Sequence, residues 1–259
     1  MNKSFLLASI FCLLTLLTGC VRYEVGINFD NQHQGEIVQH IKLEQQLTTL
    51  SGSEAIKWLN SLEKRAAQLQ GRTKRISGQE IVVTIPFGNG DELAKKFNEF
   101  FKADEQSAVN AIAGEGLDLV QLNSQMSVEQ NNWLIVERNT MNLNVDLRAL
   151  GVLSNRGNII VSPGSLIDLE FILNTPWRAS IPANSDSLSP DIGETKKQLI
   201  WHLQPGQINN IAVVFWAPNY IGIGTIAIAL LMIAGFYLKY GRLPLLNEPI
   251  KTTVATEKQ

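Results

Sequence analysis

The chain has 259 residues, of which 45% are hydrophobic and 18% charged, and its formal net charge at pH 7 is −2. Its two cysteines, Cys12 and Cys20, lie near the N-terminus, so the chain after Cys20 has no disulfide, thiol nucleophile or cysteine metal ligand. Between Val21 and Pro218 there are 17 Lys and Arg against 22 Asp and Glu, and this acidic balance argues against nucleic acid as a partner.

The stretch from Met1 to Cys20 has the layout of a bacterial lipoprotein signal. Lys3 stands near the start, and an uncharged apolar run extends from Phe5 to Leu17. Gly19 directly precedes Cys20, as a small residue does at the cleavage site of a secretory signal. We expect residues 1–19 to be a signal peptide cleaved between Gly19 and Cys20, with palmitate or a similar acyl chain on Cys20. The alternative is an uncleaved membrane helix, but the apolar run is shorter than the ~20 residues of a span.

A second apolar run predicts a transmembrane helix over residues 219–238. The segment from Ile221 to Leu238 carries no charge, and a helix of that length covers roughly 27 Å, enough to cross a bilayer core. Aromatic residues stand at both ends of this run, as the two water interfaces favour: Trp216, Tyr220, Tyr237 and Tyr240. The alternative is a buried helix of a soluble domain, which is disfavoured because no face of the segment is polar.

The charges that flank this run predict its orientation. Lys239 and Arg242 follow it directly, whereas the last Lys or Arg before it is Lys197. Since positive flanks stay cytoplasmic, we expect a cytoplasmic tail at 239–259 and an exported domain at 20–218. Export of Cys20 independently gives the same topology. The two anchors would lie in one membrane or in closely apposed ones.

In the first part of the exported domain, the residue pattern predicts two units, each a hairpin followed by a helix. Strands are expected at 21–29 and 35–44, the second with Ile37, Ile41 and Leu43 on one face together with Gln39. A helix with a capping box at Ser51 and Glu54 follows and ends at Gly71.

The second unit begins with a hairpin at 72–87 that turns at residues 77–79. A tight turn at Gly88–Gly90 and an N-cap at Asp91 then start a helix. Its apolar stripe comprises Leu93, Phe97, Phe100 and Phe101.

In the second part of the exported domain, the residue pattern predicts several strands and a long polar loop. After a looser link at 103–116, two long strands are expected at 117–129 and 133–148, with Trp133 and Ile135 in phase with the apolar face. A further strand at 166–173 has Leu169 and Phe171 inward. The remaining expected segments are a loop at 182–196 and strands at 197–203 and 208–216.

Together these segments predict an α+β fold of mostly antiparallel sheet. Its two early helices pack on one face, and one transmembrane helix follows at the C-terminus. Residues 20–102 and 117–216 are candidate sub-units of the exported domain.

The residues that could carry chemistry form no catalytic or metal-binding pattern. His33, His40 and His202 have no helical metal spacing, and no cluster of acids is expected beside them. Asp168 and Glu170 share a strand face, as residues two apart on any exposed strand do. We therefore predict no catalytic residue, no metal site and no cofactor.

Two further groups of residues have a functional and a structural interpretation. Six basic residues against one acid make the stretch 57–75 basic. Such a stretch suits contact with anionic lipid headgroups, and a solvated helix face and hairpin end is the favoured alternative. The candidate contact residues are Lys64, Arg65, Arg72, Lys74 and Arg75.

The aromatic residues could line an apolar ligand cavity or, as we favour, form an ordinary core. They are Trp58, Phe97, Phe100, Phe101, Trp133, Trp177 and Trp201.

The whole arrangement resembles the LppM-like lipoproteins, and most of all their cyanobacterial branch of uncharacterised membrane-anchored proteins. The resemblance rests on the lipobox leader, the opening Cys20–Val25, the strand Gly35–Val38, the stretches Asn174–Asn184 and Leu199–Gly206, and the terminal span with its basic flank. It implies attachment to the envelope and lipid binding, and it brings no catalytic residue. For the cyanobacterial branch the membrane would be plasma or thylakoid, with the domain on the periplasmic or thylakoid-lumenal side.

From these features we expect a non-enzymatic binding or scaffold domain, held at a membrane surface by a lipid and a single-pass helix. Membrane lipids and membrane proteins are the candidate partners, and the residues indicate no oligomeric state. The alternatives are a carrier of an apolar small molecule and an envelope enzyme that acts on lipids.

Overall fold

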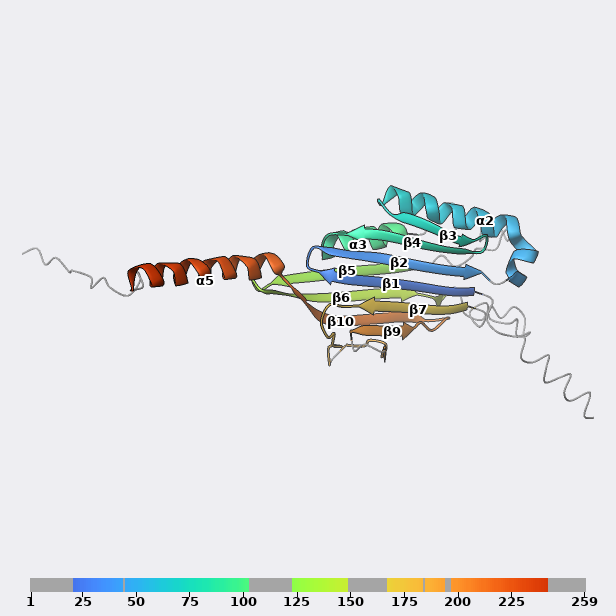
Figure 1. The fold of residues 1–259 in the computed structure, drawn as a ribbon. Coiled ribbons are helices and arrows are strands. Elements are labelled where there is room, and N and C mark those ends of the chain that lie inside the picture. Colours follow the sequence, from blue (N-terminus) through green and yellow to red (C-terminus); the bar gives the residue numbers. More distant parts are fainter. Residues whose placement is uncertain are drawn as a thin grey trace, which may run out of the picture.

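The computed structural model describes residues 21–43, 45–102, 123–148, 167–183, 185–193 and 197–241. Two β-sheets and two helices pack into one domain, and a third helix leaves one end of it and points away from the strands (Figure 1). The leader with Cys20, the link at 103–116 and the tail from Arg242 onward lie outside the described residues.

The larger sheet, sheet A, has seven strands in the order β3-β4-β2-β1-β7-β9-β8. All neighbours are antiparallel except β1 and β7, which are parallel. The strands are β1 (Val21–Asn31), β2 (Gln34–Leu43), β3 (Arg72–Ser77), β4 (Glu80–Phe87), β7 (Ile167–Asn174), β8 (Asp191–Ile192) and β9 (Gln198–His202). The predicted α+β class with mostly antiparallel strands is thus confirmed.

The smaller sheet, sheet B, has the antiparallel order β10-β6-β5, with β5 (Asn123–Asn132), β6 (Val136–Asp146) and β10 (Ile208–Pro218). Its apolar face packs toward sheet A, where the rings of Phe29 on β1 and Phe215 on β10 lie 4.7 Å apart. Both residues lie near the ends of their strands, so β1 and β10 end at the same end of the domain.

The two early helices, α2 (Gln45–Gln68) and α3 (Gly90–Phe100), add their apolar stripes to this core. Helix α2 contacts β3 and β4, and α3 contacts β4 and β5. Both helices therefore pack on the inner face of sheet A, as predicted. The buried helical residues include Leu59, Leu62, Ala66, Leu93, Phe97 and Phe100.

The starts of both helices differ from the prediction. Helix α2 begins at Gln45, so the pair Ser51 and Glu54 lies inside it and does not start it. The N-cap of α3 is Asn89 and not Asp91: its backbone is extended, and its side chain accepts a hydrogen bond of 2.8 Å from the Glu92 amide. Asparagine caps as well as aspartate, which leaves Asp91 exposed in the first turn.

The turn between β5 and β6 also differs from the prediction. β5 continues to Asn132, and the turn consists of Trp133, Leu134 and Ile135. The Trp133 amide donates to the Val136 carbonyl at 2.8 Å and closes the turn. Trp133 and Ile135 were expected on the apolar face, but they are 66% and 45% exposed.

Helix α5 (Tyr220–Tyr240) is long and apolar enough to cross a membrane. Only 6% of its most apolar 18-residue window is buried against the described parts, so it is not a core helix of this domain. It starts where β10 ends, whereas β1 starts at the opposite end of the sheets (Figure 1).

Candidate functional site

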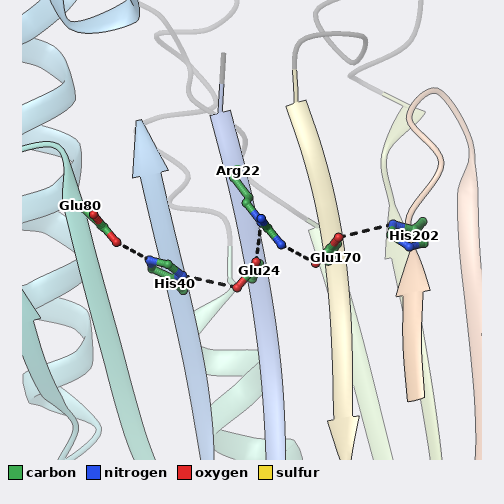
Figure 2. Close-up of polar contacts among 6 residues, drawn as sticks. All are labelled: Arg22, Glu24, His40, Glu80, Glu170 and His202. Atoms are coloured by element: carbon green, nitrogen blue, oxygen red, sulfur yellow. Dashed lines mark hydrogen bonds and ion pairs between the residues drawn. The ribbon is translucent and has the colours of Figure 1, made fainter. Parts of the chain in front are cut away.

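A row of charged and histidine side chains crosses the outer face of sheet A (Figure 2). Side chains on a strand alternate between faces, so Arg22 and Glu24 point outward from β1 while Tyr23 and Val25 are buried. The described outer-face residues of β1, β2 and β7 are all exposed or half-buried. No described helix packs on this face.

The strand register brings the row together from distant parts of the chain. Glu24 lies opposite His40 on β2 and opposite Glu170 on β7. Glu170 in turn lies opposite His202 on β9. The row thus joins residues from the first strand of the domain to the last strands of sheet A.

Each histidine of the row lies between two carboxylates. His40 Nε2 is 2.8 Å from Glu80 Oε1, and its Nδ1 is 3.4 Å from Glu24 Oε2. His202 Nδ1 is 3.6 Å from Glu170 Oε1, and its Nε2 is 3.5 Å from an oxygen of Asp191. The prediction that no acids cluster beside the histidines is therefore wrong, because strands far apart in sequence supply them.

Arg22 lies at the centre of the row and separates two like charges. Glu24 and Glu170 stand directly opposite each other on parallel strands, an arrangement that repels. The Arg22 guanidinium contacts both carboxylates. The charge of Glu24, and to a lesser extent that of Glu170, raises the pKa of Arg22 above its ordinary value.

Asp168, Glu170 and His202 each offer one ligand atom within 4.8 Å of the others. Asp168 and His202 are exposed, and Glu170 is already paired with Arg22. Exposed acidic groups of this kind are common without a metal. We therefore interpret the row as a network of surface ion pairs.

A second feature is the junction between the domain and α5. Asn219 alone separates β10 from α5, and it is 7% exposed. Its side-chain oxygen accepts a hydrogen bond of 3.0 Å from the Gly222 amide and so caps the helix. Its own amide donates to the Ile135 carbonyl at 3.0 Å, and its side-chain nitrogen donates to Asn132 Oδ1 at 3.2 Å.

Gly222 completes the junction because it has no side chain. A Cβ atom at this position would lie 1.5 Å from the Leu134 carbonyl oxygen. The β5–β6 turn therefore sits directly on the first turn of α5. Nothing in the sequence pattern pointed to this contact, since it joins a turn to a helix that starts much later in the chain.

The structure separates the five basic residues predicted for lipid contact. Lys64, Arg72 and Lys74 are exposed. Arg65 donates to the Phe100 carbonyl at 3.1 Å and lies over the Phe100 ring. Arg75 pairs with Glu63 at 2.9 Å.

The two positive charges predicted to flank the span are only partly described. Lys239 lies in the last turn of α5. Arg242 is outside the described residues.

Two open hollows lie on the surface of the described part of the chain. One, of about 400 Å³, is lined mainly by amide and hydroxyl groups on the outer face of sheet B and the loop at 185–187. The other, of about 520 Å³, lies beside Arg178, Ile192 and Trp216. None of the aromatic residues predicted for a cavity or core lines either hollow.

Most of those aromatic residues belong to the core, as favoured. Phe97, Phe100, Phe101 and Trp201 are buried in it, and Trp58 packs against it partly buried. Trp133 and Trp177 are exposed.

The family model of a protein of unknown function, DUF3153, matches residues 25–244. The chain belongs to this family. The DUF3153 match includes both the packed domain and α5, so the two form one family unit.

Comparison with curated proteins gave no match. Among solved structures, the chain is similar to the folded domain of the Mycobacterium tuberculosis LppM protein, determined by NMR. The identity is 12%, the alignment covers 78% of this chain and 94% of that chain, and the TM-score is 0.39. A likeness of this degree carries no argument about function.

Proposed function

We propose that this DUF3153 protein is a non-enzymatic binding or scaffold domain held at a membrane surface by two anchors. Helix α5 is one anchor, and acyl chains such as palmitate on Cys20 are the other. The proposal includes cleavage between Gly19 and Cys20, a cytoplasmic tail at 239–259 and a domain on the periplasmic or thylakoid-lumenal side. Lys239 and Arg242 support this orientation. The finer affiliation, to LppM-like lipoproteins of the cyanobacterial branch, remains a prediction.

One observation carries the proposal: Val21, which follows the proposed lipid site, and α5 lie at opposite ends of one packed domain. Cys20 is bonded to Val21, the first residue of β1, and α5 follows the last residue of β10. β10 has 11 residues, and a strand of that length spans roughly 34 Å. A rigid domain of this length between two membrane attachments is suited to hold partners or membranes at a set distance.

This geometry favours two apposed membranes over one. Asn219 and Gly222 fix α5 against the β5–β6 turn, so the strands extend away from the bilayer that would hold α5. The acyl chains on Cys20 would then start roughly 30 Å or more from that bilayer. A lipid in the same bilayer would require β1 to detach or the junction to open.

Lipids and membrane proteins are the proposed partners. The outer face of sheet A, on which no described helix packs, is a surface open to them. The exposed Lys64, Arg72 and Lys74 are the basic residues suited to anionic headgroups. The two described hollows contain one carboxylate, Asp186, and no histidine. Nothing in them favours the enzyme or the carrier alternative.

Membrane fractionation of cells that express four forms tests the double anchoring. The forms are the full chain, Cys20→Ala, a chain that ends at Asn219, and a chain with both changes. We expect both altered forms to remain attached to membranes, each through its one remaining anchor, and the doubly altered form to be released. Release of either single form would contradict the proposal, and so would crosslinking and native mass spectrometry that recover neither a lipid nor a protein partner.

A further inference from the structure

The β5–β6 turn exposes three consecutive apolar side chains next to the start of α5. Trp133 is 66% exposed, Leu134 59% and Ile135 45%. Turns are normally built from Gly, Asn, Asp, Ser and Pro. Leu134 also has a φ of +69°, a conformation that strains any residue with a Cβ atom. In water, the exposed apolar side chains of this turn and the positive φ of Leu134 are both energetically unfavourable.

Specific contacts hold the turn in this conformation. The Leu134 amide donates to Asn132 Oδ1 at 2.9 Å. The Leu134 carbonyl oxygen occupies the space left free by Gly222, and the Ile135 carbonyl accepts a hydrogen bond from the Asn219 amide. The surrounding structure therefore fixes these apolar side chains beside the helix.

The apolar surface continues from the turn onto α5. The Trp133 ring meets the Trp216 ring at 6.4 Å. Tyr220 and Ile221, in the first turn of α5, are 64% and 67% exposed. We use the term collar for these six residues at the base of α5: Trp133, Leu134, Ile135, Trp216, Tyr220 and Ile221.

We infer that the collar is a membrane-contact surface, seated in the interface of the bilayer that α5 crosses. The inference rests on the proposed function, because it requires α5 to lie in a bilayer. Lipid is the occupant because the collar is continuous with the apolar surface of α5, so a bilayer around the helix start reaches these residues too. Trp and Tyr rings favour this depth, where an apolar body meets a polar surface.

The collar also sets how the domain stands on the membrane. A single helix through a bilayer leaves its attached domain free to tilt when the connection is flexible. Here the connection is the buried Asn219, and the collar adds apolar contacts beside the helix. Together they keep the strands directed away from the membrane.

Single-cysteine labelling of the mature full chain tests the inference, in a Cys20→Ser background so that only the introduced thiol reacts. The reporter is Leu134→Cys on the collar. The control is Gly78→Cys in the β3–β4 turn at the far end of the domain, where an added Cβ meets no atom within 4 Å. A third variant, Gly235→Cys, reports on α5 itself, and an added Cβ there is equally free.

Each protein carries a bimane fluorophore and is reconstituted into vesicles of phosphatidylethanolamine and phosphatidylglycerol. Lipids with a nitroxide near the headgroup or deep in the acyl chain serve as quenchers. We expect the shallow nitroxide to quench the label at 134, the deep nitroxide to quench the label at 235, and neither to quench the label at 78. Ile135→Cys provides a second collar position if Leu134→Cys disturbs the turn.

The outcomes separate this inference from the proposed function. If neither nitroxide quenches the label at 235, α5 is not in the bilayer and the proposed function fails. If the label at 235 is quenched while those at 134 and 135 behave like the one at 78, the inference is overturned and the proposed function stands. Shielding of the collar labels from lipid and from aqueous iodide would also overturn it, because a second copy or another protein would then cover the collar.

Discussion

Gly222 is the residue on which the docking of α5 against the domain depends. An alanine there would place its Cβ against the Leu134 carbonyl oxygen, which lies 1.5 Å from that position. Gly222→Ala must therefore separate the helix from the β5–β6 turn, and overpacking of this kind costs about 1–3 kcal/mol. We expect faster proteolysis at the turn and a lower urea midpoint for the full chain in detergent.

Gly224→Ala is the matched control, two positions along the same helix. An added Cβ there meets no atom within 4 Å, so we expect no loss of stability. Equal behaviour of the Gly222→Ala and Gly224→Ala variants would show that the turn does not hold the helix.

Glu92 predicts a pH dependence of the first turn of α3. Its carboxylate pairs with Lys96 at 2.8 Å and accepts a hydrogen bond of 2.7 Å from the Gly88 amide. These contacts, with Lys96 the largest cause, lower the pKa of Glu92 below its usual 4.5. The stabilisation is therefore present above pH 4.5 and is lost as the pH falls through the lower pKa of the folded state.

Urea unfolding between pH 6 and 3 measures this contribution. The full chain should lose stability as the pH falls below about 4.5, and Glu92→Gln should lack that part of the loss. Glu99→Gln is the control on the same helix, because Glu99 is exposed and takes no part in these contacts. If Glu92→Gln and the unaltered chain lose equal stability in this range, the Glu92 contacts do not stabilise the folded state.

At the scale of strands, Arg22 offsets the repulsion between Glu24 on β1 and Glu170 on β7, which lie opposite each other in this parallel pair. Arg22→Gln would leave Glu24 and Glu170 opposite each other without a shared cation. The Arg22 side chain is 56% exposed, so solvent weakens the effect to about 1 kcal/mol or less.

Unfolding of Arg22→Gln and Arg72→Gln at low and high salt tests this account. Arg72 is exposed on the edge strand β3, and its loss should change little. The loss in free energy of unfolding caused by Arg22→Gln should be smaller at high salt, because salt screens the repulsion between the two glutamates. A loss that is independent of salt would indicate lost packing in place of lost charge balance.

The individual elements of this fold could be predicted wherever the apolar period was clear. Alternation along β2 correctly placed Gln39 inward, and the residue is 1% exposed. The β5–β6 turn could not be placed, because Gln130, Asn131 and Asn132 resemble a turn while strand pairing with β6 continues through them. Trp133 and Ile135 fit the alternation of β6 by chance, and only tertiary structure shows that they belong to the turn.

The candidate sites could not be predicted from the sequence for a related reason. The carboxylates around His40 and His202 come from other strands, and register between strands is fixed by packing of the whole sheet. The parallel pairing of β1 with β7 begins at Val21 and Ile167, which are far apart in the chain. Local patterns predict which face a residue takes, and they do not predict which strand lies beside it.

At the scale of the whole molecule, we propose a rigid domain whose two membrane anchors would lie at opposite ends. The sequence indicated both anchors but left open whether they share a membrane. The direction of β1, the position of α5 after β10 and the junction at Asn219 favour anchors that are held apart (Figure 1).

Capture of one population of vesicles by another tests this central claim most directly. The full chain with an acylated Cys20 is reconstituted through α5 into immobilised vesicles, and fluorescent vesicles without protein are added. We expect the fluorescent vesicles to be captured, capture to be lost in Cys20→Ala, and capture to fall in Gly222→Ala, where the domain can turn back toward its own bilayer. The claim would be contradicted if the acylated chain and Cys20→Ala captured equal amounts of fluorescent vesicles and the acyl chains were found in the bilayer that holds α5.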